Sequence, residues 1–212
     1  MRVDIWADIV CPWCYIGKRE FELGLGEFAH RDSVGVVYRA FELDPSFPPA
    51  TSTPVPELLS ARYGLTAAQA RDAERRVAAR AATVGLVMDG SRVMGNTFDA
   101  HRLVAFGRDR GRQAEVLQRL YEAYFGAGRG IFETADLAGL GAAVGLDRAE
   151  AERVLRGGGY DGEVRADEQQ ATELGISGVP FFVLDGRYGV SGAQPAAAFT
   201  AALDQAWGQR SR

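Results

Sequence analysis

The stretch IVCPWCYIG, residues 9–17, holds both cysteines of the 212-residue chain, with Pro12 and Trp13 between them. Such a pair can be a structural disulfide, half of a metal site or a redox couple. A cross-link over so short a loop stabilises a fold by only about 2 kcal/mol. A closed zinc site needs four ligands, and the only histidines are His30 and His101. The sequence therefore favours the redox couple and predicts no metal.

The residues around the pair predict a junction between a strand and a helix. Arg2–Val10 is rich in β-branched and aromatic residues, which is typical of a buried strand, and apolar residues recur at helical spacing from Tyr15 onward. Pro12 suits the first helical turn, so Cys11 is expected at or near the N-cap and Cys14 one turn further in. The free N–H groups and the dipole of the helix favour the thiolate of Cys11, which makes it the attacking sulfur.

Two side chains close to the pair have several possible roles. Asp8 lies three residues before Cys11. It raises the pKa of the thiol if it points inward, receives a proton from Cys14, or is a solvated residue at the end of the strand, which is the role we expect. Trp13 is expected to be exposed, where it contacts either a substrate or another part of the protein.

Composition excludes several functional classes. The formal net charge is -4 and 25% of the residues are charged, so no basic surface for nucleic acid is indicated. The chain has no run of 18 apolar residues, so no membrane span is expected. The N-terminal residues lack the pattern of a secretion signal, and we therefore expect a cytoplasmic protein. Reducing conditions in that compartment also disfavour a purely structural disulfide.

The remaining sequence predicts sheet-forming segments at the two ends of the chain. A second strand is expected within Val34–Leu43, followed by the proline-rich Asp44–Pro56, which is predicted as a linker without helix or central strand. Strand character returns in Val179–Gly192, a hairpin with a tight turn at Asp185–Gly186. A final helix is expected from Pro195.

The segment between these ends is predicted to be helical. Capping residues indicate three helix starts. They are the pair Thr66 with Gln69, either Asn96 or Thr97, and the pair Asp147 with Glu150. The apolar residues between them recur at helical spacing, as expected for a helical core. A helical insert therefore separates the two halves of the sheet.

Four stretches resemble the DsbA-like branch of the thioredoxin superfamily and, within it, the FrnE-like subgroup. They are DIVCPWCYIGK (8–18), FELDP (41–45), NTFDAHRL (96–103) and GVPFFVLDGRYGVSGAQP (178–195). They follow one another in the order typical of that family. The resemblance implies an α/β protein, a thioredoxin fold interrupted by an all-helical insertion domain. We expect a discontinuous thioredoxin-like domain of residues 1–52 and 175–212 and an insertion of residues 53–174.

The resemblance also implies an activity. It is that of a dithiol–disulfide oxidoreductase, in which Cys11 attacks and Cys14 resolves. The Val179–Pro180 peptide bond is expected to be cis, which places Pro180 beside the cysteines. The expected supporting residues are Pro12, Trp13 and Pro180, and the expected substrate-binding residues are Val179, Trp13 and Phe181. No bound cofactor is expected apart from the redox-active Cys11–Cys14 disulfide.

The expected partners are proteins or small molecules that contain a disulfide or a dithiol. Glutathione is a candidate co-substrate, and the sequence leaves the oligomeric state open. His101, in one of the matching stretches, either pins two helices together, which we favour, or shuttles protons and contacts a substrate. Phe41 and Leu43 are expected to be core residues near the site.

Two other functions are compatible with the sequence. Glutathione-dependent isomerases of the 2-hydroxychromene-2-carboxylate type and kappa-type glutathione transferases share the interrupted layout. In those enzymes a serine commonly stands at the position of Cys11, so the presence of both cysteines favours redox exchange. A holdase-like protein that binds unfolded chains through an apolar surface around Trp13 and Phe181 is the third possibility.

Overall fold

The chain folds into two compact units. The computed structural model describes residues 1–49, 51–88, 92–128 and 130–210. The first unit consists of Met1–Leu43 and the chain from Arg165 onward, and the second unit is Asp44–Val164. The domain boundaries that we predict from the sequence, 52/53 and 174/175, both lie further along the chain than the observed ones. The difference at the second division arises because a helix that begins at Asp161 enters the first unit well before its end.

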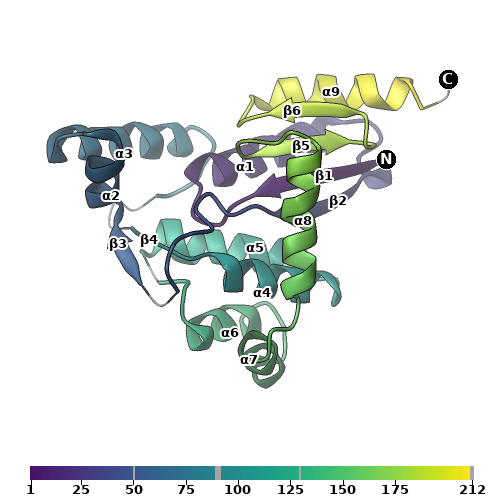
Figure 1. Cartoon of the computed structure of the whole chain (residues 1–212). Coiled ribbons are helices and arrows are strands. Elements are labelled where there is room, and N and C mark those ends of the chain that lie inside the picture. Colours follow the sequence, from purple (N-terminus) through teal and green to yellow (C-terminus); the bar gives the residue numbers. More distant parts are fainter. Residues whose placement is uncertain (50, 89–91, 129, 211–212) are drawn as a thin grey trace. The chain divides into compact units, whose positions relative to one another are not determined.

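The first unit is an α/β layer structure around a four-stranded sheet with the order β2-β1-β5-β6. Its elements are β1 (Arg2–Ala7), α1 (Pro12–Glu27), η1 (Arg31–Ser33), β2 (Gly35–Ala40), the later turns of α8 (Asp161–Glu173), β5 (Phe181–Leu184), β6 (Tyr188–Ser191) and α9 (Ala196–Gly208). β1 pairs parallel with β2 and antiparallel with β5, which in turn pairs antiparallel with β6 (Figure 1). The thioredoxin-type sheet is therefore assembled from both ends of the chain.

β5 supplies core residues to both faces of this sheet. The ring centroid of Phe182 lies 5.5 Å from that of Phe21 on α1 and 4.6 Å from that of Phe199 on α9. The next residue, Val183, packs with Trp6 of β1 in a cluster that includes residues from α8 and the loop that follows it. Because successive strand residues point to opposite faces, α1 and α9 cover one face and α8 the other.

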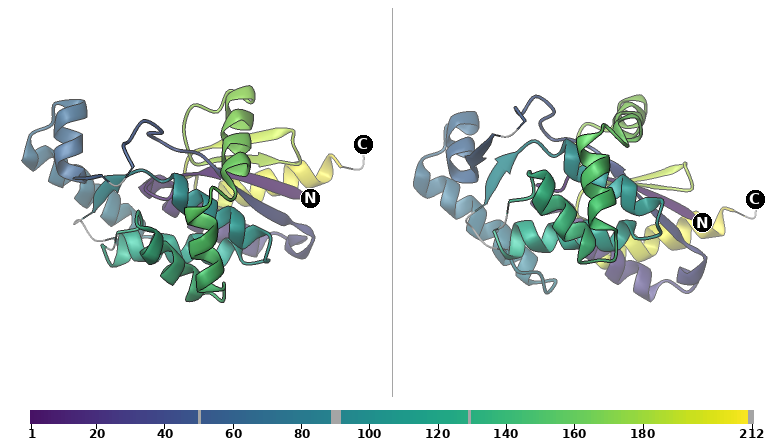
Figure 2. Two further views of the ribbon diagram at one scale, coloured as in Figure 1. Left: turned by 60° about the horizontal axis from the view of Figure 1, so that its bottom comes forward. Right: turned by 90° about the horizontal axis from the view of Figure 1, so that it is seen from below.

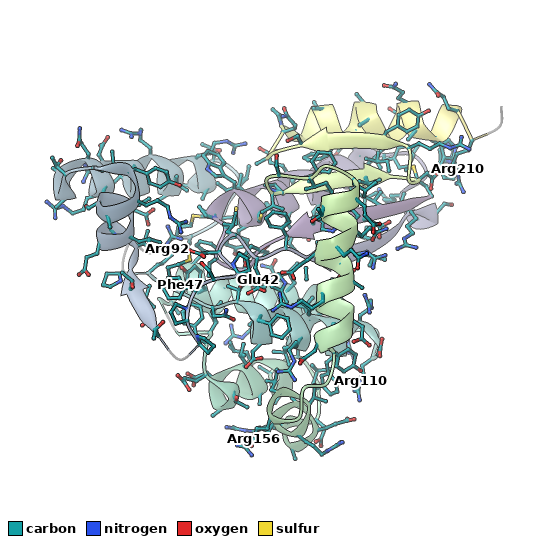
Figure 3. The ribbon with its side chains drawn as sticks, in the orientation of Figure 1. Glu42, Phe47, Arg92, Arg110, Arg156 and Arg210 are labelled. Carbon is teal, nitrogen blue, oxygen red and sulfur yellow. The ribbon has the colours of Figure 1, made fainter. Side chains whose placement is uncertain are left out.

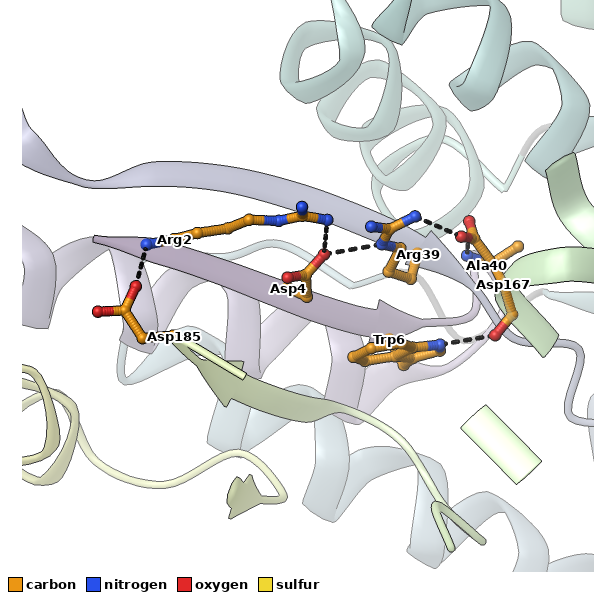
Figure 4. A network of polar contacts seen from close by, with 7 residues as sticks. All are labelled: Arg2, Asp4, Trp6, Arg39, Ala40, Asp167 and Asp185. Atoms are coloured by element: carbon orange, nitrogen blue, oxygen red, sulfur yellow. Dashed lines mark hydrogen bonds and ion pairs between the residues drawn. The ribbon is translucent and has the colours of Figure 1, made fainter. Parts of the chain in front are cut away.

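A polar network fastens α8 to the edge strand β2 (Figure 4). The carboxylate of Asp167 pairs with Arg39 at 2.7 Å and accepts the main-chain N–H of Ala40 at 3.1 Å. Arg39 also pairs with Asp4 at 2.8 Å, and the indole N–H of Trp6 donates to the main-chain oxygen of Asp167 at 2.9 Å. Asp167 thus occupies a position on the β2 edge at which another strand could otherwise add.

The two points at which the chain crosses between the units are held together on the first unit. Glu42, labelled in Figure 3, is buried next to the last residue before the outward crossing. Arg165 is the first residue after the return crossing, and its guanidinium pairs with the Glu42 carboxylate at 2.9 Å. The long segment between them therefore starts and ends at one place.

The second unit is mainly helical. Its elements are β3 (Ser52–Pro54), α2 (Val55–Tyr63), α3 (Ala67–Ala82), β4 (Val93–Gly95), α4 (Phe98–Arg108), α5 (Gln113–Tyr121), the π-helix η2 (Glu122–Gly126), α6 (Thr134–Ala142), α7 (Arg148–Arg156) and the first turn of α8. Helices α4 to α7 pack on one another, and α2 lies beside α3 (Figure 2). In the described ranges, none of the helices is long and apolar enough to span a bilayer.

Two expectations for this unit need correction. β3 and β4 form a small antiparallel sheet, so the insertion is not all-helical. The proline-rich stretch contains β3 and the start of α2, so it is not only a linker. Pro54 lies on a two-stranded sheet and Pro56 in the first turn of a helix, positions at which a missing N–H is tolerated.

The predicted caps of two helices are confirmed. Thr66 and Gln69 form the capping box of α3, with the Thr66 hydroxyl accepting the Gln69 N–H at 3.2 Å. Asp147 caps α7 by accepting the Glu150 N–H at 2.7 Å. The N-cap position of α4 is Thr97, whose side chain makes no capping hydrogen bond. The side chain of Asn96, the other predicted residue, accepts the N–H of Phe98, the first residue of α4, at 3.0 Å.

A buried charge lies in the second unit at Arg92 (Figure 3). Its guanidinium carbon lies 4.8 Å from the ring centroid of Phe125 and 5.7 Å from that of Tyr124. The same group forms an ion pair with Glu74. Arg92 therefore links α3 to the π-helix η2 through both charge and aromatic contact.

The packing of α1 on α9 depends on Gly24. A Cβ atom at this position would lie 2.5 Å from the main-chain oxygen of Ala196 and 2.9 Å from the Cβ of Phe199. We expect Gly24→Ala to lower the free energy of unfolding by about 1–3 kcal/mol in a urea titration, as overpacked substitutions do. Gly26→Ala on the same helix is the control, because nothing lies within 4 Å of a Cβ there. Equal stability of the two variants would contradict the close approach.

Candidate active site

Both cysteines lie at the start of α1, as the sequence predicts. Cys11 is the N-cap residue, with φ -81° and ψ 112°, and Pro12 is the first residue of the helix. The main-chain oxygen of Cys11 accepts the N–H of Cys14 at 3.1 Å and that of Tyr15 at 3.3 Å. Both thiols are free.

The start of β5 brings a second segment to the cysteines. The Val179–Pro180 peptide bond is cis. The Cys11 thiol donates to the main-chain oxygen of Val179, with 3.7 Å between sulfur and oxygen. On α1, a Cβ at Gly17 would lie 2.8 Å from Cγ of Pro180. The fold therefore places Pro180 against the helix that carries both cysteines.

Gly17 is a site residue that the sequence reading missed. Its lack of a side chain is what lets Pro180 approach α1. A glycine inside a helix costs about 1 kcal/mol relative to alanine, so its presence within an otherwise regular helical pattern was the available signal.

Cys14 is the more protected of the two thiols. Burial raises the pKa of Cys14 well above the ordinary thiol value, and the hydrogen bond and charge of Cys11 raise it further. A backbone hydrogen bond from Asp8 acts in the opposite direction, and the Asp8 charge raises this pKa. Cys14 is therefore held as a thiol, and it needs a proton acceptor before it can attack another sulfur.

Asp8 is buried rather than solvated, which corrects our expectation for this residue. Only 1% of it is exposed. Its carboxylate accepts the main-chain N–H of Leu43 at 2.8 Å, and its main-chain oxygen accepts the N–H of Cys11 at 3.2 Å. The segment that follows β2 covers Asp8, and the residues next to Asp8 in the sequence carry no sign of that contact.

Leu43 is also placed differently from our expectation. It is 41% exposed and does not belong to the core. Phe41 is partly buried against the cluster that contains Trp6, as a core residue would be. Trp13 is 45% exposed, in agreement with the prediction.

The other predicted site residues lie in several environments. Val179 and Phe181 are partly buried and pack, with Phe41, on the cluster of core residues that contains Trp6. His101 lies on α4 in the second unit and is buried, as expected for a histidine between helices. Within the ranges that the structure covers, no three His, Cys, Asp or Glu residues are grouped as a metal site would require.

Comparison with known proteins identifies a protein family and a similar crystal structure. The family model for the DsbA-like thioredoxin domain matches residues 2–204. The crystal structure of a probable DsbA oxidoreductase from Streptomyces coelicolor is 49% identical in sequence, with a TM-score of 0.96, over 99% of this chain and 91% of that one.

Two more distant structures share the fold. The cytosolic disulfide reductase DsbM from Pseudomonas aeruginosa, solved with GSH, is 21% identical, with a TM-score of 0.63 over 97% of this chain and 98% of that one. A 2-hydroxychromene-2-carboxylate isomerase is 17% identical, with a TM-score of 0.69 over 100% of this chain and 97% of that one.

The raised pKa of Cys14 has a consequence for stability. Unfolded thiols titrate near pH 8.5, and a raised pKa in the folded state contributes stability that is complete below that pH and is lost above it. We expect the free energy of unfolding of the reduced protein to fall by up to about 1.4 kcal/mol per pH unit above pH ~8.5, relative to Cys14→Ser. Urea titrations of both proteins between about pH 7.5 and 10 measure this difference. Parallel profiles would show that Cys14 is not protonated more tightly in the folded state.

Proposed function

Because the chain belongs to the DsbA-like thioredoxin domain family, we propose that it is a dithiol–disulfide oxidoreductase of the FrnE-like subgroup. The observation that carries the proposal is the pair of free thiols at the start of α1, with Cys11 at the N-cap and Cys14 one turn further in. The main-chain oxygen of Val179 accepts a hydrogen bond from the Cys11 thiol, and the ring of Pro180 lies against the same helix.

In the first step, the Cys11 thiolate attacks one sulfur of a substrate disulfide. A bond forms between Cys11 and that sulfur, and the other substrate sulfur leaves as a thiolate. The first-turn N–H groups of α1 and the positive end of its dipole lie at Cys11 and stabilise negative charge there.

In the second step, Cys14 resolves the mixed disulfide. We propose that Asp8 accepts the Cys14 proton, because it is buried, ionisable and near enough for its charge to raise the pKa of that thiol. The Cys14 thiolate attacks the Cys11 sulfur, the substrate leaves as its second thiolate, and the Cys11–Cys14 disulfide remains. Two electrons have then passed from the dithiol to the substrate, and the reverse sequence oxidises a dithiol.

Substrate binding requires Cys11 to become accessible. Its side chain is buried in the dithiol form, and its sulfur contacts the Val179 carbonyl. We propose that an extended substrate segment pairs with the Val179 main chain, as in β-strand addition. Trp13 and Phe181 contact the same substrate in this proposal, while Pro12 and Pro180 support the site.

The substrate class that we propose is a protein or a small molecule with a disulfide. Glutathione is the proposed reductant: two molecules reduce the Cys11–Cys14 disulfide and leave as glutathione disulfide. The proposed compartment is the cytoplasm. DsbM, which has the same fold, is described as cytosolic and was solved with GSH, which supports both proposals.

An isomerase is the second candidate function, because a 2-hydroxychromene-2-carboxylate isomerase shares the fold. Such an enzyme activates the thiol of glutathione and forms no disulfide of its own. The two candidates therefore differ in whether Cys11 is needed, and the two thiols at the helix start favour redox exchange.

Variants of the two cysteines test the proposed function with insulin as the disulfide substrate. We expect Cys11→Ser to reduce insulin no faster than the uncatalysed background, because the attacking sulfur is lost. Cys14→Ser should accumulate a mixed disulfide with insulin, seen as an increase in protein mass, because the resolving step is lost. Insulin reduction by Cys11→Ser at the wild-type rate would refute the exchange mechanism.

The same variant separates the other functions. Glutathione-dependent turnover of a hydroxychromene carboxylate that is unchanged in Cys11→Ser would favour the isomerase. A holdase would be favoured if both wild type and Cys11→Ser suppress the aggregation of insulin chains and neither protein accelerates the reduction of insulin.

The role of Asp8 can be tested separately. Asp8→Asn keeps the shape of the side chain but removes the base, so we expect resolution of the mixed disulfide to slow by about 100-fold, the lower end of a general-base contribution. Rapid-quench mass spectrometry measures the decay of the mixed disulfide in wild type and variant. Unchanged decay would show that the Cys14 proton leaves by another route.

A further inference from the structure

The function proposed above assigns no role to the buried carboxylate of Glu20 on α1. Its Oε2 accepts the main-chain N–H of Ala196, the first residue of α9, at 2.8 Å. The N-cap residue of α9 is Pro195, whose ring has no group that could accept this N–H. The first N–H groups of a helix need acceptors, and the helix dipole favours a negative charge beside them. Glu20 therefore caps α9 from a neighbouring helix.

The loop that leads into α9 lies against the helix of the two cysteines. It runs from Ser191, the last residue of β6, to Ala196. A Cβ atom at Gly17 of α1 would lie 3.4 Å from the Cα of Ala193 and 3.5 Å from its Cβ. The same Cβ position lies 2.8 Å from Cγ of Pro180. The loop and the Pro180 ring therefore contact α1 at one residue.

The start of this loop holds the main chain of Pro180. The N–H of Gly192 donates to the Pro180 oxygen at 2.9 Å, which continues the pairing of β5 with β6 by one residue. Because the proline ring fixes φ, the peptide unit with this oxygen turns relative to the preceding unit about ψ alone. The oxygen of the preceding unit belongs to Val179 and accepts the Cys11 thiol. The loop thus restricts the main chain that contacts Cys11.

Two further hydrogen bonds brace the loop internally. The side chain of Gln194 donates to the main-chain oxygen of Ser191 at 2.9 Å, and its N–H donates to the oxygen of Gly192 at 3.0 Å. Three residues separate Gly192 from Ala196. Because the loop is this short and is bonded to itself, the Glu20 carboxylate at one end also limits the movement of Gly192 at the other.

We propose, building on the proposed oxidoreductase function, that Glu20 is a positioning residue for substrate binding. It fixes the loop at Ala196, and the loop holds the Pro180 main chain, so that Val179 is kept in place to pair with an extended substrate segment. The substrates that depend on Glu20 are then disulfides in a polypeptide main chain. A disulfide without amide groups has nothing to pair with Val179 and does not depend on Glu20.

The test compares a peptide that contains one disulfide with bis(2-hydroxyethyl) disulfide, which has no amide groups. We expect Glu20→Ala to raise KM for the peptide about tenfold with little change in kcat, because ordering the loop becomes a cost of binding. For bis(2-hydroxyethyl) disulfide, kcat/KM should stay unchanged. Glu20→Gln retains an oxygen that can accept the Ala196 N–H, so it should keep the wild-type KM for the peptide.

Thr200→Val is the matched control for weakened contact between α1 and α9. The Thr200 hydroxyl donates to the main-chain oxygen of Gly24 at 3.0 Å, one turn of α9 beyond Ala196. The substitution removes a hydrogen bond between the same two helices but leaves the loop in place. It should lower stability in a urea titration without altering KM for the peptide.

A second variant tests the loop where the fold is not at risk. Gln194 is exposed, so Gln194→Ala removes the hydrogen bond to Ser191 with little effect on stability. We expect it to raise KM for the peptide about threefold, since this bond is between neutral groups. This variant decides the question if Glu20→Ala does not fold.

The outcomes separate this inference from the function on which it rests. If the wild type reduces both disulfides and neither Glu20→Ala nor Gln194→Ala raises KM for the peptide, the role of Glu20 is wrong and the oxidoreductase stands. The role is also wrong if Thr200→Val or Glu20→Gln raises this KM as much as Glu20→Ala, or if Glu20→Ala slows both substrates equally. If the wild type forms no Cys11–Cys14 disulfide and reduces neither substrate, the proposed function fails together with the inference.

Discussion

The candidate site depends on how closely Pro180 approaches α1. Only a glycine at position 17 leaves room for the proline ring, because a Cβ there would lie 2.8 Å from it. The approach is fixed from the other side by the antiparallel pairing of β1 with β5, in which Trp6 lies opposite Phe181. The cysteines come from one end of the chain and Pro180 from the other, so the site exists only once these two strands have paired.

Asp8 illustrates the electrostatic demands of such a site. A buried carboxylate is costly unless hydrogen bonds replace its lost hydration, and the Leu43 N–H supplies one of them. Its charge disfavours the thiolate of Cys14 at rest, when no attack is needed. The side chain that makes the resolving thiol hard to ionise is also the nearest group in the proposed mechanism that can receive its proton.

Local features of the site and fold could be predicted from the sequence, but contacts between distant segments could not. Pro12 indicated where α1 begins, and Asp185–Gly186 indicated the hairpin turn, in which both residues have positive φ. The burial of Asp8 and the exposure of Leu43 arise from a hydrogen bond between residues 35 positions apart, and no local pattern encodes it. The family resemblance supplied the overall architecture, yet it gave no indication of how this bond would place either side chain.

The ion pair between Glu42 and Arg165 has a consequence for how proteins of this kind can evolve. The two residues lie where the chain leaves and re-enters the first unit, and the ion pair holds these two places close together. Closing a loop becomes more costly by only about 0.6 kcal/mol for each doubling of its length. A gene rearrangement that lengthens or shortens the segment would therefore change the cost of closing this loop only slightly. The sheet-containing unit can thus keep the candidate site while the inserted unit diversifies.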